Sequence, residues 1–378
     1  TITMEVFKIK IKEIDSDLLQ VNVKDCLKEV YKHMEAEDLA YIKDKALDFH
    51  KSQVLKEAII QSAKILEVDG NTDEIKSMID SAMQAGVERN LGHDYLVDID
   101  ARYEESARVT SPTPWDIINE LMQGGLGGGE LGVVVAPAGI GKSWVLSAMG
   151  AYAISQGLNI VHYTLELNEA YVGLRYDSIF SGVESQNLKY HKEEVMEKLF
   201  KLKGNLTIKY YPTKSCTVNT LSAHLKKVTT FGKKVDMVLV DYADIMRDVH
   251  KSSEMRHALG NIYEDLRGLA GELQVPIWTA SQANRSALDE DVIEATKVAE
   301  SYAKVMTADF VMSLSRKIED KIGNTGRFHV IKNRFGPDGL TYPAKINTNI
   351  GKIEIFESNS VQGKDVQHKI NNRDNQTK

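Results

Sequence analysis

The pattern of hydrophobic and polar positions separates a helical first part of the chain from a later part in which short strands alternate with helices. Residues 6–14 alternate apolar side chains with lysine, which is typical of a short strand. Apolar positions between residues 43 and 66 recur on one helical face. Residues 71–85 begin with a capping pattern of Asn and Glu that favours a second helix. We therefore expect residues 1–90 to form a small, mostly helical N-terminal region that packs or docks and carries no chemistry.

The next segment, residues 91–114, is polar and irregular, which is typical of a linker between domains. A short helix is expected at residues 115–122, directly before a glycine-rich stretch at residues 124–129. Because no predicted strand precedes these glycines, they favour a tight turn over a phosphate-binding loop. At the other end of the chain, residues 359–378 are polar, and we expect a disordered tail there.

Residues 115–358 have the rhythm of an α/β domain. Five leucine and isoleucine residues between positions 259 and 273 step by three and four, which predicts a helix. Strands that alternate with helices predict a mainly parallel sheet covered on both faces. The short apolar runs that predict buried strands are residues 131–135, 159–165, 237–240 and 275–280.

One segment at the end of the first of these strands fits the P-loop pattern, with an alanine in place of the first glycine. Gly139 and Gly141 allow backbone N–H groups to point at phosphate oxygens, and the N-terminus of the following helix adds its positive end. We expect Lys142 to reach the β- and γ-phosphates of ATP, and the hydroxyl of Ser143 to bind Mg²⁺. The predicted loop consists of Ala136, Pro137, Ala138, Gly139, Ile140, Gly141, Lys142 and Ser143.

Two acidic residues follow predicted strands and complete this site. Asp241 ends the strand at residues 237–240 and is expected to hold Mg²⁺ together with Ser143, because ligands bind at the carboxyl edge of a parallel sheet. Glu166 follows the strand at residues 159–165 and is expected to orient or deprotonate the attacking water. The alternatives are that Asp241 only caps a turn and that Glu166 is an ordinary surface residue.

Five motifs occur in the order found in DnaB-type replicative helicases, and the resemblance extends over roughly residues 90–356. Around His93–Tyr95 and Ala299–Ser301 the chain is most similar to the branch carried by T-even-type and related marine phages. The resemblance implies a RecA-like core, a homo-hexameric ring and movement from 5′ to 3′ on single-stranded DNA. The segments that carry it are Ala136–Ser143, Tyr163–Glu166 with Arg175, Val240–Tyr242, Ser281–Arg285 and Lys332–Pro337.

The resemblance also implies roles for individual residues. Glu166 would be the catalytic base, Gln282 a sensor of the γ-phosphate, and Arg175 a further nucleotide contact. Lys332 and Arg334 lie two positions apart on a predicted strand, so both side chains point to one face. In the family this pair reaches into the ATP of the neighbouring subunit, where the arginine stabilises developing negative charge. Ring formation would then be part of the catalytic site.

DNA contacts are expected in the loop that follows the glutamine sensor, here residues 286–306, because this loop lines the central channel in the family. The chain departs from the family pattern at Ala299 and Tyr302, where more distant members have Arg and Gly. Ser301 and Lys304 are the expected DNA-binding residues, because phosphate contacts need hydrogen-bond donors and carry no sequence code. The alternative for Lys304 is that it does not touch DNA.

Charge and composition narrow the range of partners. The formal net charge is −7 and the pI is near 5.9, which disfavours coating nucleic acid with the whole surface but permits a small basic lining. Two cysteines, Cys26 and Cys216, without a CxxC motif, argue against a zinc site and fit a reducing cytoplasm. No apolar run approaches the ~20 residues of a membrane span, and the first residues lack the layout of a signal peptide. We expect a cytoplasmic protein without a membrane partner.

These motifs predict an ATP- and Mg²⁺-dependent DNA helicase that acts on single-stranded and forked DNA at the replication fork, with a primase or a helicase loader as a candidate partner. The main alternative is a RecA-like recombinase or filament-forming DNA-binding ATPase, which would carry its own polymerisation segment. A further alternative is a signalling-type ring ATPase, which would hydrolyse ATP without stimulation by DNA.

Overall fold

The computed structural model describes residues 39–67, 108–250, 252–298 and 303–374, together with residues 75, 78–79, 82, 95–96, 99–100 and 103. The chain divides into two compact units, residues 1–103 and residues 104–378. The strand predicted at residues 6–14 lies outside the described residues.

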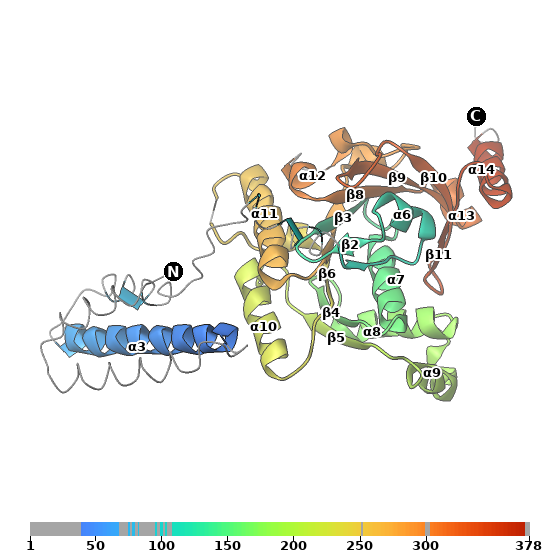
Figure 1. Cartoon of the computed structure of the whole chain (residues 1–378). Coiled ribbons are helices and arrows are strands. Elements are labelled where there is room, and N and C mark those ends of the chain that lie inside the picture. The colour runs from blue at the N-terminus through green and yellow to red at the C-terminus, as the bar shows by residue number, and fades with distance from the viewer. Residues whose placement is uncertain are drawn as a thin grey trace, which may run out of the picture. The chain divides into compact units, whose positions relative to one another are not determined.

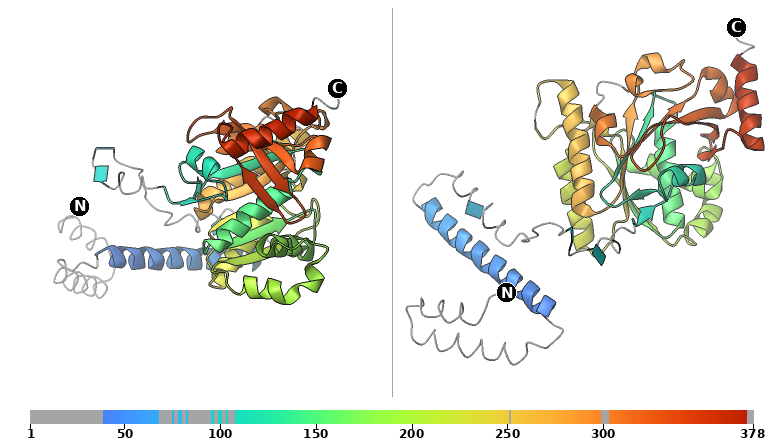
Figure 2. Two further views of the ribbon diagram at one scale, coloured as in Figure 1. Left: turned by 90° about the vertical axis from the view of Figure 1, so that its right-hand side faces the viewer. Right: turned by 45° about the horizontal axis from the view of Figure 1, so that its top comes forward.

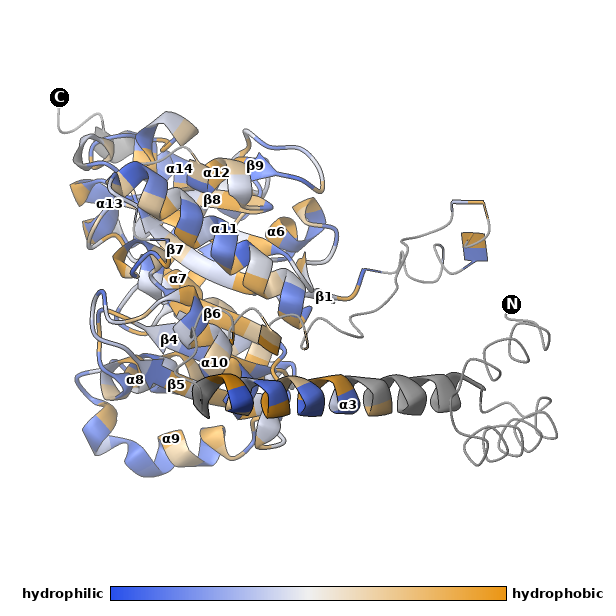
Figure 3. Ribbon diagram, turned by 90° about the vertical axis from the view of Figure 1, so that its left-hand side faces the viewer, coloured by the Kyte–Doolittle hydropathy of each residue, from blue (hydrophilic) through white to orange (hydrophobic). Residues whose placement is uncertain are grey.

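In the first unit, the main described element is helix α3 (Leu39–Glu67), which confirms the helix predicted between residues 43 and 66. The described turns of α3 carry both hydrophobic and hydrophilic residues (Figure 3). Ile75, Met78, Ile79 and Ala82 are helical, in agreement with the second predicted helix, whose other residues lie outside the described part.

The second unit consists of an α/β core with a small two-stranded sheet at its start (Figure 1). Its strands are β1 (Thr110–Ser111), β2 (Leu126–Gly127), β3 (Leu131–Ala136), β4 (Asn159–Thr164), β5 (Asn205–Tyr210), β6 (Met237–Asp241), β7 (Ile277–Gln282), β8 (Phe310–Ser315), β9 (Thr325–Asn333), β10 (Thr341–Asn347) and β11 (Lys352–Ile355). Its helices are α6 (Asp116–Leu121), α7 (Lys142–Ser155), α8 (Glu169–Ser181), α9 (Lys192–Leu199), α10 (Val218–Thr230), α11 (Met255–Leu273), α12 (Ala303–Thr307), α13 (Ile318–Gly323) and α14 (Val361–Asp374).

Within the described residues, the main sheet has nine strands in the order β11-β10-β9-β8-β3-β7-β6-β4-β5. The strands from β8 to β5 are parallel, whereas β9, β10 and β11 continue the sheet as antiparallel hairpins. All four strands predicted from apolar runs are present in the parallel part, with ends shifted by one or two residues. The prediction of a mainly parallel α/β sheet is therefore confirmed.

Helices cover both faces of the parallel part, and the alternation of side chains along β3 shows how. Val134 packs in one buried cluster with residues of α7 and α8, whereas Val133 and Val135 pack in the other with residues of α10 and α11. In Figure 1, α10 and α11 accordingly lie on one side of the sheet and α7 and α8 on the other. Strands buried on both faces read as continuous apolar runs, which is why they could be predicted.

The end of the chain differs from the sequence prediction. Residues 361–374 form α14 rather than a disordered tail, and α14 packs beside β10 and α13 (Figure 2). Val366 and Ile370, four positions apart, are 0% and 2% exposed. Burying this one-sided apolar pair orders a segment whose composition is otherwise polar.

The predicted linker also contains structure at its end, because Thr110 and Ser111 pair with β2. Arg108 donates to both carboxylate oxygens of Glu130 and to the carbonyl of Gly125, which fixes the glycine-rich turn in front of β3. Gly124 and Gly125 adopt φ values of 109° and 122° where the chain turns, whereas Leu126 and Gly127 form β2, so the predicted tight turn holds a short strand. None of the helices in the described ranges is long and apolar enough to cross a lipid bilayer.

Candidate functional site

The P-loop borders a cavity of about 340 Å³ at the carboxyl edge of the parallel strands. It leaves β3 after Ala136 and enters α7 at Lys142. Gly139 and Gly141 have φ values of 72° and 122°, which residues with a Cβ atom rarely adopt. The residues that line the cavity are Gly139, Gly141, Lys142, Ser143, Trp144, Glu166, Leu167, Arg175, Arg316, Lys321 and Thr348.

Two buried polar atoms near this cavity have no hydrogen-bond partner among the described residues, Nη1 of Arg175 and Oδ1 of Asp241. Burial raises the pKa of Asp241, against the opposing effect of the Ser143 hydroxyl, Arg175 and Lys142. Burial lowers the pKa of Arg175, and the carboxylates of Asp241 and Glu166 oppose that shift. Buried polar groups in native proteins are almost always paired, so these two atoms fit groups that a bound phosphate and a hydrated metal ion would satisfy.

The strand register brings two predicted site residues, Asp241 and Glu166, to the same edge. Asp241 pairs with Thr164 across β6 and β4, and the N–H of Leu165 donates to the Asp241 carbonyl at 2.8 Å. Glu166 follows directly and lines the cavity. The structure thus brings Glu166, Asp241 and the P-loop to one edge of the sheet.

Gln282 lies one strand away from the P-loop, because it is the register partner of Ala136. The Tyr242 hydroxyl donates to Oε1 of Gln282 at 3.4 Å, and Nζ of Lys142 lies 4.5 Å from the centre of the Tyr242 ring. Tyr242 therefore connects the proposed sensor to the P-loop lysine, a link that the sequence did not reveal.

Five residues that line the cavity were not predicted from the sequence, Trp144, Leu167, Arg316, Lys321 and Thr348. The guanidinium of Arg175 lies 5.1 Å from the centre of the Trp144 ring, which supports the arginine from α7. Arg316 directly follows β8, and this position at the end of an apolar strand could have identified it as a site residue from the sequence. Thr348 lies in the turn between β10 and β11, which is not recognisable as part of the site without the fold.

Lys332 and Arg334 do not lie at this cavity. The backbone N–H of Arg334 donates to the Asp309 carbonyl, and the N–H of Asp309 donates to the carbonyl of Leu131, the first residue of β3. The P-loop follows the last residue of β3, so the length of the strand, roughly 17–20 Å, separates the two places. Lys332 and Arg334 thus lie at the amino edge of the sheet and the P-loop at its carboxyl edge.

Of the two DNA-binding residues predicted from the sequence, only Lys304 is among the described residues. Ser301 lies outside the described residues. Lys304 is 1% exposed, and its ammonium group pairs with Asp244 at 2.9 Å and donates to Ser281 at 3.2 Å. This burial contradicts the prediction that Lys304 contacts DNA. Asp244 in turn accepts the backbone N–H of Gln282 at 2.9 Å, so Lys304 supports the strand end that carries Gln282.

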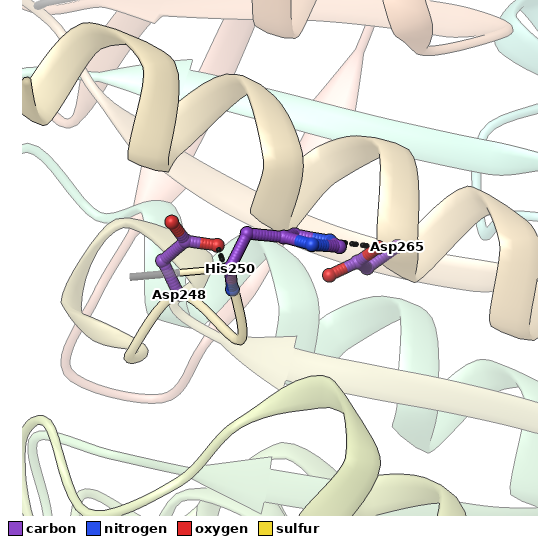
Figure 4. A group of neighbouring side chains, drawn as sticks. All are labelled: Asp248, His250 and Asp265. Carbon is purple, nitrogen blue, oxygen red and sulfur yellow. Dashed lines mark hydrogen bonds and ion pairs between the residues drawn. The ribbon is translucent and has the colours of Figure 1, made fainter. Parts of the chain in front are cut away.

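Asp248, His250 and Asp265 form a separate cluster beside α11 (Figure 4). Nε2 of His250 lies 3.3 Å from the Asp265 carboxylate, and the two oxygens of Asp248 accept the backbone N–H groups of His250 and Ser252. Hydrogen bonds within the protein account for this arrangement, and we assign no metal ion to it.

The fold and the cavity define a P-loop NTPase with a RecA-like core. The family model described as the DnaB-like helicase C terminal domain matches residues 112–350, and the chain belongs to this family.

Among curated relatives, the chain is 25% identical over 307 residues to the DnaB-like replicative helicase of Enterobacteria phage T4, covering 73% of this chain and 64% of the phage protein. The chain thus matches less than two thirds of the length of that relative. A solved structure described as a DnaB-like replicative helicase and its interactions with primase aligns with a TM-score of 0.64 at 14% identity, covering 93% of this chain and 87% of that one. A second solved structure, of an ATPase domain, aligns with a TM-score of 0.60 at 16% identity, covering 69% and 97%. These structural likenesses describe the fold.

Proposed function

We propose that this protein is an ATP-driven replicative DNA helicase that works as a ring of identical subunits, six by family resemblance, and moves from 5′ to 3′ along single-stranded DNA in the cytoplasm. The observation that carries the proposal is the cavity around the P-loop, into which Lys142, Glu166 and Arg175 converge. Membership of the DnaB-like family supports DNA as the partner on which this ATPase acts.

In the proposed mechanism, backbone N–H groups of residues 138–143 and the side chain of Lys142 hold the phosphates of ATP. Ser143 and Asp241 would hold Mg²⁺, whose charge offsets that of the phosphates. Glu166 orients the attacking water and accepts its proton, while Arg175 donates its free Nη1 to a phosphate oxygen. Gln282 reports on the γ-phosphate through its link to Tyr242 and Lys142.

Lys332 and Arg334 complete the site of the next subunit. Their position at the amino edge of the sheet supports this role, because they are a full strand length from the P-loop of their own chain. The guanidinium of Arg334 would meet the charge that develops on the transferred phosphoryl group. A lone subunit then lacks one component of its own catalytic site.

For the DNA contact, a groove of about 760 Å³ beside the start of α11 replaces Lys304 as the candidate. It is lined by the exposed side chains of Arg256 and His257, by Asn284 and Thr296, and by one described carboxylate, Glu264. Donors of this kind suit phosphate contacts without sequence preference. Replacing Arg256 by Ala should reduce the stimulation of ATP hydrolysis by single-stranded DNA, whereas the same change at the exposed Lys192 of α9 should not.

A primase or a helicase loader is a proposed protein partner. The support is the structural relative whose description includes interactions with primase. Co-sedimentation of the purified protein with its primase, with and without ATP, would test this partner.

The test of the proposed function is ATP-dependent unwinding of forked DNA that carries both tails, only the 5′ tail or only the 3′ tail. We expect unwinding to require the 5′ tail and to be lost in Lys142→Ala and Arg334→Ala. ATP hydrolysis with strand exchange but without unwinding would support the recombinase alternative instead. Hydrolysis that DNA does not stimulate would support a ring ATPase that does not translocate.

A further inference from the structure

The carboxylate of Asp309, at the amino edge of the sheet, accepts hydrogen bonds from three residues. Oδ2 accepts the N–H of Leu131 at 2.9 Å and Nε of Arg267 at 3.1 Å. Oδ1 accepts Nη2 of Arg267 at 3.1 Å and Nη1 of Arg334 at 2.8 Å. Asp309 is 3% exposed, so its charge depends on these partners. One buried carboxylate thus faces two guanidinium groups, one more cation than it needs.

The two arginines are held differently. Arg267, on α11, binds Asp309 through two parallel hydrogen bonds, the fork geometry that orients a guanidinium most firmly. Arg334 donates to Asp309 through Nη1 only, and its side chain is 45% exposed. No other side-chain hydrogen bond of Arg334 is present within the described ranges. Arg334 is therefore the partner that can leave Asp309 at the lower cost.

We propose that Asp309 is a positioning residue, which orients the Arg334 side chain toward the nucleotide of the neighbouring subunit. When Arg334 moves to that nucleotide, Arg267 remains paired with Asp309 and compensates its negative charge. This inference rests on the proposed function, in which Arg334 acts across the subunit boundary. It adds two residues to the machinery of the reaction that neither the P-loop nor the family motifs contain.

The physical reason is the cost of an unpaired buried charge. Without Arg267, transfer of Arg334 to a phosphate would leave Asp309 buried and without a cation, which opposes the transfer. Without Asp309, Arg334, Arg267 and the nearby Lys332 would repel one another, and nothing would fix the direction of the Arg334 side chain. Lys332 itself donates to the carbonyls of Val305 and Met306 at the end of α12, so it does not replace Arg267 as the cation that pairs with Asp309.

The test uses mixed rings, assembled from two variants before nucleotide is added. Lys142→Ala subunits retain Arg334 but cannot use ATP, and Arg334→Ala subunits have the opposite defect. A mixture of the two regains activity, because some interfaces combine an intact P-loop with an intact arginine. We expect Asp309→Asn to lower ATP hydrolysis at saturating nucleotide by roughly 10- to 100-fold, as the loss of a charge-assisted hydrogen bond implies, with nucleotide affinity unchanged.

The expected signature is that Asp309→Asn regains activity when mixed with Lys142→Ala but not when mixed with Arg334→Ala. A variant that only perturbs folding would regain activity with neither. Arg267→Gln, at a side chain that is 40% exposed, provides a second variant that leaves the buried carboxylate in place, and the same pattern of mixing is expected for it.

Asp236→Asn is the matched control. Asp236 also lies at the amino edge, where it accepts the N–H of Asn159 at the start of β4, but it pairs with Lys234 and not with Arg334. Rings of the Asp236→Asn variant should hydrolyse ATP at the rate of the unmodified ring.

Wild-type hydrolysis by Asp309→Asn and Arg267→Gln, or recovery with Arg334→Ala but not with Lys142→Ala, would overturn the inference. If the reference mixture of Lys142→Ala and Arg334→Ala itself shows no recovery, then Arg334 does not act across subunits, and the proposed ring chemistry fails together with the inference.

Discussion

At the scale of single residues, the ion pair between Lys304 and Asp244 links the interior of the core to the proposed phosphate sensor. Asp244 accepts the N–H of Gln282, the hydroxyl of Ser281 and the hydroxyl of Tyr263, and Lys304 neutralises it. Because all these groups are buried or nearly so, the loss of either charge leaves the other without compensation.

We expect Lys304→Ala to lower the free energy of unfolding by about 3–5 kcal/mol, the typical cost of removing one partner of a buried pair. The control is Lys297→Ala, which removes a half-exposed pair with Glu290 and should cost about 0–1 kcal/mol. Chemical denaturation of both variants measures the difference. Unchanged stability together with weakened DNA binding would instead restore Lys304 as a DNA contact.

His162 gives the stability of the protein a specific dependence on pH. It is 1% exposed, and burial, with Arg175 as a second cause, lowers its pKa to about 3. In the unfolded chain, His162 takes up a proton near pH 6.5, whereas in the folded protein it stays neutral down to about pH 3. The contribution of neutral His162 to the free energy of unfolding is therefore fully present above pH 6.5 and is lost as the pH falls toward 3. At pH 5 the loss amounts to about 2 kcal/mol, at about 1.4 kcal/mol per pH unit.

Denaturation midpoints measured between pH 7 and pH 5 test this expectation. His162→Gln should reduce the pH dependence, whereas the control His368→Gln, at an exposed position on α14, should not. An identical pH profile for wild type and His162→Gln would show that His162 does not titrate in this range.

The predictability of the site differs from residue to residue. The P-loop, Glu166 and Asp241 were predictable because each lies at the end of an apolar strand, and parallel strands bring such ends to one edge. The partner of Lys304 is 60 positions away in the sequence, and Thr348 reaches the cavity only through the antiparallel hairpin of β10 and β11. Contacts of this kind depend on the arrangement of strands, which local patterns do not contain.

At the scale of elements, the approach of β3 to β7 depends on the absence of a side chain at Gly132. Gly132 is the register partner of Trp278, and a Cβ at this position would lie 2.4 Å from a ring atom of Trp278. Trp278 is 0% exposed, so its ring has no free space into which to move.

Gly132→Ala should therefore lower the free energy of unfolding by about 1–3 kcal/mol, as overpacking of a core does. Gly268→Ala is the matched control, because a Cβ there meets no atom within 4 Å and alanine is the better helix former in α11. Thermal unfolding of the two variants should shift in opposite directions. Equal stability of Gly132→Ala and wild type would mean that β3 and β7 move apart at little cost.

Among the elements, the buried strands and the long helix α11 were predictable because their periods are strong. α14 and β1 were not predicted from the sequence, because tertiary contacts stabilise them in segments of polar composition. In α14 only Val366 and Ile370 carry the signal, and two apolar residues are too few to define a helical period.

At the scale of the whole molecule, the proposed division of each site between two chains makes hydrolysis depend on assembly. ATP hydrolysis per chain should rise with protein concentration and reach a plateau as rings form, because dilute single chains lack Arg334 at their P-loop. Steady-state hydrolysis and mass photometry over the same concentration range test this. Full activity of dilute single chains would contradict the arrangement, and Arg334→Ala should show low activity at every concentration.

In the proposed ring, the opposite positions of the P-loop and Arg334 in the sheet determine how many catalytic sites of the assembly are complete. A row of such chains joined head to tail always has an incomplete site at one end and an unused arginine at the other. Only closure into a circle brings these two ends together, so every opening of the circle, for example to admit a DNA strand, inactivates one site without any change within a subunit. The number of working sites would then report directly whether the assembly is open or closed.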